Sequence, residues 1–321
     1  MNRREFLRVM GLGALGALAA GLPPCARAWE PARDGDWEYE INLPIIGATK
    51  PRPTAPGPTP TPQPTPTPSY EPLSKGAVII RAASDVATLG ADWWYSYTLG
   101  PTQYLDDQHV PMLRDPGVYH TGAWRELPQG ATVLFYNEPN DAQQAGVVLS
   151  AYDVARHLHA VHEQRPDLRI VGPALFTSWD ACDWYDHHLL EAYHEMYGVG
   201  SWPCAAIAVH SIQGTVAWHA DRIAWVVSIY DQHGYDHLPV WVTEYMGGPW
   251  WDYESQATIA AGVWEWMLTQ PRIERACWFP ARWAESWTDP GGVGWMDQRL
   301  LDDAGELTSV GAVYAGLKGD N

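Results

Sequence analysis

The sequence predicts an α/β protein folded as a (β/α)₈ TIM barrel, preceded by an export signal and a Pro/Thr-rich linker. From Tyr70 onward about 250 residues remain, which is the usual size of this barrel. They contain eight short apolar runs, with amphipathic helical segments between the later ones. Alternation of strand and helix implies a parallel sheet with right-handed crossovers, and eight such units close without an edge. A doubly wound open sheet is the competing fold, but no Gly-x-Gly-x-x-Gly follows an early strand and no phosphate loop is present.

Residues 1–28 have the pattern of a twin-arginine export signal. Arg3-Arg4 precedes the small, apolar stretch Val9–Leu22, and Ala26-Arg-Ala28 offers a cleavage site. The apolar part has about 14 residues, whereas a spanning helix needs roughly 20, so we expect no integral membrane span after cleavage. Cys25 raises the alternative of a lipidated cysteine, although Leu22-Pro-Pro-Cys25 lacks the small residues that such a signal needs. We expect a secreted or cell-envelope protein.

The next segments link this signal to the main domain. Residues 29–50 are too short for a domain and have no assigned role. Residues 51–69 form a Pro/Thr-rich linker in which alternate residues lack an amide donor, so we expect an extended polyproline II spacer. Residues 70–321 form the predicted barrel domain.

The elements of this domain follow the apolar periodicity. The predicted strands are Val78–Ile80, Trp93–Tyr97, His109–Leu113, Thr132–Tyr136, Ile170–Ala174, Ala206–His210, Val240–Thr243 and Ala276–Phe279. The clearest predicted helices are Gln144–Gln164, Cys182–Tyr197, Trp218–His233 and Ser255–Thr269.

Composition restricts the class of partner. A formal net charge of -18 argues against nucleic acid and anionic lipid, and leaves neutral polysaccharide compatible. The 19 Trp and 16 Tyr against 4 Phe favour rings with a polar edge, which stack on sugars and bond their hydroxyl groups. About half of the tryptophans are expected in the core. Metal-ligand spacing is absent from the cysteines and from the run His157, His159 and His162, so we expect no metal and no cofactor. We also expect a monomer.

Two glutamates carry the prediction of function. Glu138 lies in Phe135-Tyr-Asn-Glu-Pro-Asn140, after the fourth strand, and Glu244 lies in Val240-Trp-Val-Thr-Glu-Tyr245, after the seventh. Strands four and seven face each other across a barrel, so both carboxylates converge over its mouth. Hydrolysis of a glycosidic bond needs one carboxylic acid for the leaving oxygen and one carboxylate to attack or to position water. The pair is therefore a complete set for a glycoside hydrolase.

These motifs resemble the acid/base and nucleophile motifs of clan A glycoside hydrolases. Within the clan they are most similar to family 128, the Asl1-like β-1,3-glucanases, together with Val209-His210, Trp278-Phe279 and the closing Leu301–Thr308. The resemblance implies retaining hydrolysis of an equatorial bond, with endo-β-1,3-glucan as the expected substrate. Glu138 would be the acid and later the base, Glu244 the nucleophile and Asn137 a ligand of a sugar hydroxyl. The carboxyl groups should be about 5 to 5.5 Å apart.

Further side chains are candidates for this site. Family members commonly have His-x-Tyr after the sixth strand, whereas this chain has His210-Ser-Ile212, so Tyr245 or Tyr97 would have to supply the hydroxyl group. His210 would bond Glu244 or the substrate, or be a packed structural residue. Trp278 would form the floor of the sugar site. Candidate walls and neighbours, each equally compatible with a core or ion-pair role, are Trp94, Trp283, Trp250, Trp251 and Arg114.

Two alternatives stay open. A non-catalytic carbohydrate-binding barrel on the cell envelope is favoured by the missing tyrosine, but it does not need two facing carboxylates. A glycosidase similar to the β-xylosidases of family 39 shares the same pair of glutamates.

Overall fold

The computed structural model describes residues 69–78, 82–100, 108–141, 149–176, 179–248, 253–282 and 298–319. They belong to one compact unit, Thr65–Asn321. The predicted signal, short segment and linker lie outside the described residues, apart from Ser69. Among the helices of these ranges, none has the length and apolarity needed to cross a membrane.

The strands of the described chain pair in parallel throughout. They are β1 Ser74–Val78, β2 Trp93–Tyr95, β3 Met112–Leu113, β4 Thr132–Phe135, β5 Arg169–Val171, β6 Ile207–Ile212, β7 Val240–Met246 and β8 Ile273–Trp278. One sheet has the order β2-β1-β8-β7-β6, and the other has the order β3-β4-β5. Single parallel bridges, Trp94 with His109 and Val171 with Ala206, connect the two sheets at both junctions. The predicted α/β class with parallel strands is confirmed.

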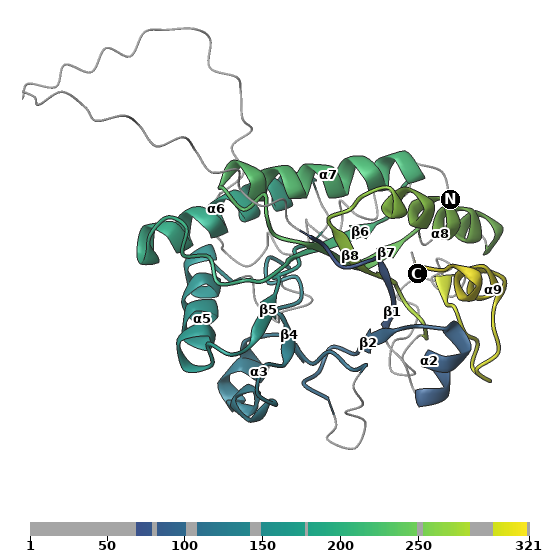
Figure 1. Cartoon of the computed structure of the whole chain (residues 1–321), viewed down its shortest axis with the longest axis horizontal. Helices are drawn as coiled ribbons and strands as arrows, with labels where there is room; N and C mark the ends of the chain where they lie inside the picture. Colours follow the sequence, from purple (N-terminus) through teal and green to yellow (C-terminus); the bar gives the residue numbers. More distant parts are fainter. Residues whose placement is uncertain are drawn as a thin grey trace, which may run out of the picture. The chain divides into compact units, whose positions relative to one another are not determined.

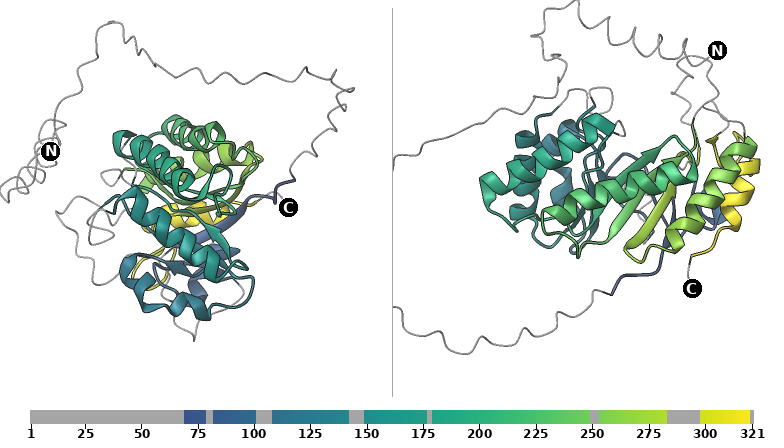
Figure 2. Two further views of the ribbon diagram at one scale, coloured as in Figure 1. Left: turned by 90° about the vertical axis from the view of Figure 1, so that its left-hand side faces the viewer. Right: turned by 90° about the horizontal axis from the view of Figure 1, so that it is seen from above.

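In the described ranges helices alternate with the strands along the chain, except between β2 and β3, and lie around the outside of the sheets (Figures 1 and 2). They are α2 Ala83–Leu89, α3 Pro116–Thr121, the 3₁₀ helix η3 Ala123–Glu126, α5 Ala151–Gln164, α6 Trp179–Tyr197, α7 Val216–Gln232, α8 Tyr253–Leu268 and α9 Ser309–Gly316. The side chains of Ser150, Thr215 and Thr308 accept a backbone N–H in the first turns of α5, α7 and α9. These caps begin the helices because they satisfy N–H groups that lack a partner within the helix.

Several predicted boundaries differ from the structure. β1 ends at Val78, whereas the prediction began there; Ile79 and Ile80 lie outside the described residues. The sequence misled because Gly76 looks like a strand breaker, yet a Cβ at this position would lie 2.3 Å from the Cys277 sulfur, so β1 and its neighbour require glycine. α5 begins at Ala151 rather than Gln144 because Ser150 caps it.

β7 is longer than predicted. It continues through Glu244 to Met246, and its register with β8 shifts between Val242 and Tyr245. Glu244 therefore lies within the strand rather than just past it. Such a shift decides which side chains face each side of a sheet.

Tryptophans fill much of the core, as the composition indicated. The Arg275 guanidinium lies over the rings of Trp241 and Trp93, 4.3 and 5.2 Å from their centroids. Trp124, Trp241, Trp264 and Trp278 have at most 1% of their surface exposed. Each large ring buries about 150–250 Å², which at roughly 25 cal/mol per Å² stabilises the fold by about 4–6 kcal/mol before the lost side-chain entropy is subtracted.

Candidate active site

The segment that carries Glu138 is held in an unusual backbone conformation. Tyr136 and Glu138 have φ angles of 54° and 44°, in the left-handed region that favours glycine. Each such residue costs about 1–3 kcal/mol, which its surroundings must offset. Three N–H groups, of Tyr136, Asn137 and Glu138, donate to carbonyl oxygens beside the neighbouring strands β3 and β5 at 2.8 Å each. These bonds fix Glu138 just past the end of β4.

Two tyrosines hold the second carboxylate. The Tyr97 hydroxyl donates to Oε1 of Glu244 at 2.6 Å, and the Tyr95 hydroxyl donates to the same atom at 3.1 Å. Tyr95 also lies 3.0 Å from the carbonyl oxygen of Thr243. Both rings come from β2 and the residues just after it, where they share one face at a spacing of two.

A single imidazole ring joins the two glutamates. Nδ1 of His210 lies 2.9 Å from Oε1 of Glu138, and Nε2 lies 3.5 Å from Oε1 of Glu244. His210, Glu138 and Glu244 are 1%, 4% and 3% exposed, so all three are nearly closed off from bulk solvent. The structure brings this predicted trio together.

Burial and neighbouring charges shift the pKa values of Glu244 and His210. Burial raises the pKa of Glu244, the contact with His210 opposes this, and Glu138 adds to it; the pKa of Glu244 lies above its ordinary value. For His210, burial favours the neutral ring, but Glu244 and Glu138 outweigh it and raise the pKa. Burial and then Glu244 raise the pKa values of Tyr95 and Tyr97 far above the ordinary range. Both tyrosines therefore stay protonated as donors.

Asn137 and Arg114 lie beside this trio. The side chain of Asn137 is 2% exposed, and its Oδ1 has no hydrogen-bond partner within the described part of the chain. The Arg114 guanidinium lies 5.9 Å from the centroid of the Tyr97 ring and 3.8 Å from Asp115 Oδ2. Its positive charge acts against the rise in the pKa of Tyr97.

Three other predicted contacts do not fit the geometry. Tyr245 follows Glu244 in β7 and therefore faces the other side of the sheet, where its ring meets Trp278 edge-on at 5.2 Å. Trp278 has no exposed surface and donates its indole N–H to the Gln298 carbonyl oxygen at 2.8 Å. Trp94 is next to Tyr95 and packs against His109, with centroids 4.1 Å apart. Trp283, Trp250 and Trp251 lie outside the described residues.

Tyr95 is the residue that sequence reasoning missed. The period-two spacing in Trp93-Trp-Tyr-Ser-Tyr97 could have paired it with Tyr97, since alternate strand residues share a face. Tyr97 is one of the two sequence candidates for this hydroxyl group. The contact of Tyr95 with the same carboxyl group depends on the arrangement of β2, β1, β8 and β7 in one sheet, which the sequence does not show directly.

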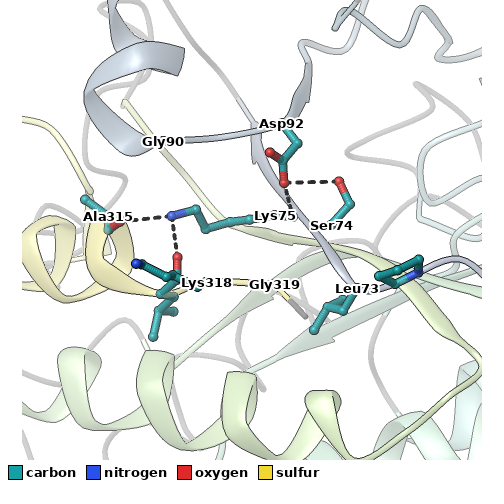
Figure 3. Close-up of a pocket in the computed structure, with 10 residues that line it drawn as sticks. Leu73, Ser74, Lys75, Gly90, Asp92, Ala315, Lys318 and Gly319 are labelled. Atoms are coloured by element: carbon teal, nitrogen blue, oxygen red, sulfur yellow. Dashed lines mark hydrogen bonds between the residues drawn. The ribbon is translucent and has the colours of Figure 1, made fainter. Parts of the chain in front are cut away.

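A cavity of about 620 Å³ lies at the opposite ends of the strands (Figure 3). It is lined by the start of β1, by Asp92 and by the end of α9. Lys75 Nζ donates there to the carbonyl oxygens of Tyr314, Ala315 and Leu317, at 2.8 to 3.1 Å. This lysine therefore serves the C-terminus of α9, and the cavity is separate from the glutamates, which lie toward the carboxyl ends of β4 and β7. Over the described residues, no group of three or more His, Cys, Asp or Glu side chains is placed to hold a metal ion.

One family model and several solved structures match the chain. The family model described as glycosyl hydrolase catalytic core matches residues 79–314. No curated protein matches the chain.

Solved structures share the fold. An endo-β-1,3-glucanase of glycoside hydrolase family 128, subgroup II, from Sorangium cellulosum is 23% identical with a TM-score of 0.56, over 76% of this chain and 98% of that one. A curdlan-specific exo-β-1,3-glucanase of subgroup III from Blastomyces gilchristii is 20% identical, with a TM-score of 0.57 and the same coverage. An endo-β-1,3-glucanase of subgroup I from Amycolatopsis mediterranei, in complex with laminaripentaose, is 18% identical with a TM-score of 0.57, again over 76% and 98%.

Proposed function

Because the chain belongs to the glycosyl hydrolase catalytic core family and is a glycoside hydrolase, we propose that it cleaves β-1,3-glucan by double displacement. One observation carries this proposal: two buried carboxyl groups, Glu138 and Glu244, lie on either side of His210, and among the described residues the hydroxyls of Tyr95 and Tyr97 bond Glu244 rather than Glu138. The two carboxyl groups therefore have different surroundings, as an acid and a nucleophile require.

In the first step Glu244 attacks the anomeric carbon. Tyr97, Tyr95 and His210 all contact Oε1, so we assign Oε2 as the attacking oxygen. The glycosidic bond breaks as Glu138 gives its proton to the departing oxygen, which leaves as an alcohol. The product of this step is a glycosyl ester on Glu244.

In the second step Glu138, now a carboxylate, takes a proton from water. The water oxygen attacks the anomeric carbon, the ester bond to Glu244 breaks, and the sugar is released with its original configuration. His210 keeps its contacts with both carboxyl groups and compensates part of their negative charge in each state. Asn137 Oδ1 accepts a hydrogen bond from the sugar hydroxyl next to the reacting carbon, a bond that strengthens in the transition state.

We also propose a closed barrel and an export route for this protein. Closure of the strands into a (β/α)₈ barrel is supported by the parallel bridges at both junctions between the two sheets. We assign residues 1–28 as a twin-arginine signal, 51–69 as the linker and 70–321 as the catalytic domain of a secreted or envelope-associated monomer. The β-1,3-linkage is supported by the activities of the structural neighbours, which are β-1,3-glucanases, and endo action is proposed with it.

The alternative of a non-catalytic binding barrel rested on the tyrosine missing after His210. Tyr97 weighs against it, because its hydroxyl, from the segment after β2, supplies the bond to Glu244. A xylosidase-like glycosidase would use the same glutamates and differs only in substrate.

The test is release of reducing ends by the purified protein from β-1,3-, β-1,4- and β-1,6-glucans and from aryl β-xylosides. Glu244→Gln and Glu138→Gln are the matched variants, since each keeps the shape of the side chain. We expect release from β-1,3-glucan, lost in Glu244→Gln. Tight binding to one glucan with no release from any substrate would contradict the proposal and favour the binding barrel.

A further inference from the structure

Tyr136 stands at the point where β4 stops alternating. Its φ is 54°, it is 1% exposed, and its ring lies flat on the ring of Phe135, with centroids 4.2 Å apart and planes 15° apart. In a regular strand, neighbouring side chains face opposite sides of the sheet. The stacking of Phe135 on Tyr136 shows that the left-handed residue breaks this alternation immediately before Asn137 and Glu138. The direction of both following side chains therefore depends on the conformation of Tyr136.

The hydroxyl group of Tyr136 is tied to helix α5. It lies 2.7 Å from Nδ1 of His157, on the second turn of that helix. The His157 ring is stacked on Tyr119 of α3, with centroids 4.2 Å apart and planes 20° apart, and meets His120 edge-on at 5.7 Å. The imidazole is therefore fixed on two sides by residues outside the active site.

The chemistry of this contact favours a neutral ring. Burial, with smaller effects from His120 and Arg156, lowers the pKa of His157 despite the nearby Asp153. A neutral imidazole can accept the hydroxyl proton at Nδ1 and keep its own proton at Nε2. The contact is then a hydrogen bond between two uncharged groups, which burial does not disfavour.

We propose that Tyr136 and His157 are positioning residues, whose hydrogen bond holds Tyr136 in the left-handed conformation and thereby aims Glu138 at the leaving oxygen. The Tyr136 hydroxyl bonds His157 on α5 rather than a carboxyl oxygen of the pair, so both residues act through the backbone between residues 136 and 138. This inference rests on the proposed function, because it presupposes that Glu138 is the general acid.

The test compares two substrates that differ in their need for acid catalysis. An unactivated oligosaccharide requires protonation of its leaving oxygen, whereas the 2,4-dinitrophenyl glycoside of the same sugar has a leaving group that departs without it. For Tyr136→Phe we expect kcat/KM to fall about tenfold on the oligosaccharide, the effect of losing one buried hydrogen bond. On the dinitrophenyl glycoside kcat/KM should stay unchanged. A role in stability alone would not separate the two substrates.

His157 gives a second, independent comparison. His157→Leu should reproduce the loss on the oligosaccharide, and His157→Asn should restore most of the activity because its amide places a polar atom near the position of Nδ1. Should Tyr136→Phe fail to fold, these two variants carry the same comparison. Tyr193→Phe is the matched control: its hydroxyl bonds Nδ1 of His159, also on α5, at 2.9 Å, but Tyr193 lies on α6 and not in the segment that carries Glu138. We expect it to change neither value.

Two results would overturn the inference. One is an equal loss on both substrates, and the other is no loss on either in Tyr136→Phe and His157→Leu. Glu138→Gln separates this failure from a failure of the proposed function. If that variant also affects both substrates equally, Glu138 is not the acid, and the proposed double displacement by Glu138 and Glu244 is wrong.

Discussion

The hydroxyl group of Tyr97 lies 2.6 Å from Oε1 of Glu244, and thus joins the segment after β2 to the middle of β7. The contact gives a buried carboxylate a neutral donor that burial keeps protonated. It also fixes one carboxyl oxygen, so that the other is the oxygen to which we assign the attack on the sugar. The chain has no tyrosine two residues after His210, and the segment after β2 supplies a hydroxyl to Glu244 instead.

Removal of this hydroxyl should impair catalysis. Tyr97→Phe loses a hydrogen bond to a charged group, which contributes about 1.5–3 kcal/mol, so we expect kcat/KM to fall roughly 10- to 100-fold. The bond lowers the pKa of Glu244, so the acidic limb of the pH profile should move to higher pH. Tyr95→Phe should have a smaller effect, because that hydroxyl is shared with Thr243 O. Wild-type kinetics in Tyr97→Phe would contradict this account.

Stability should respond to pH through Glu244. Burial raises its pKa in the folded protein above the ordinary value of 4.5, so the folded state holds a proton that the unfolded state loses first. Its contribution is full below about pH 4.5 and is lost as pH rises through the folded pKa. Glu244→Gln stays neutral, so its melting temperature relative to wild type should increase from pH 4 to pH 8. A difference in melting temperature that does not change with pH would mean that ionisation of Glu244 does not destabilise the folded protein.

His219 should make the fold sensitive to acid. Burial lowers its pKa to about 4 from the ordinary 6.5, and Nδ1 lies 2.7 Å from the Ser211 hydroxyl. The stability that this neutral ring contributes is full above about pH 6.5 and is lost as pH falls toward the folded pKa. At pH 5 the loss is about 2 kcal/mol. Urea unfolding at pH 7 and pH 5 should show that His219→Asn loses less over this interval than wild type.

Lys75 should stabilise the fold without affecting catalysis. Its ammonium group bonds three carbonyl oxygens at the end of α9, so Lys75→Met should lower the free energy of unfolding by about 1–3 kcal/mol. Lys318 lines the same cavity but is exposed, and Lys318→Met should change stability by less than about 0.5 kcal/mol. Both variants should keep wild-type kcat/KM, since the cavity lies away from the glutamates. A selective loss of activity in Lys75→Met would show that this end of the strands is part of the site.

The positions of Glu138 and Glu244 could be predicted because a motif that follows an apolar run is recognised from neighbouring residues alone. Asn137-Glu138-Pro139 and Thr243-Glu244 each follow a recognisable apolar run, and His210 follows a third, so counting strands was sufficient to place them together. The parallel α/β class followed from the same alternation.

The faces of the neighbouring aromatics could not be predicted in this way. A change of one residue in register moves a side chain to the other face of a sheet. Because β7 continues past Glu244 with a register shift, Tyr245 and Trp278 face the helices instead of the carboxyl pair. The left-handed conformation of Tyr136 is likewise set by tertiary contacts, among them its bond to His157.

The most direct test of the central claim is covalent capture of the nucleophile. The purified protein would be incubated with a 2-deoxy-2-fluoro glycosyl fluoride of the β-1,3-linked disaccharide, whose fluorine at C2 slows hydrolysis of the ester. Peptide mapping by mass spectrometry would then locate the added sugar. We predict a single adduct on Glu244, absent from Glu244→Gln. An adduct on another residue, or none on a protein that hydrolyses β-1,3-glucan, would contradict the double-displacement mechanism proposed for Glu138 and Glu244.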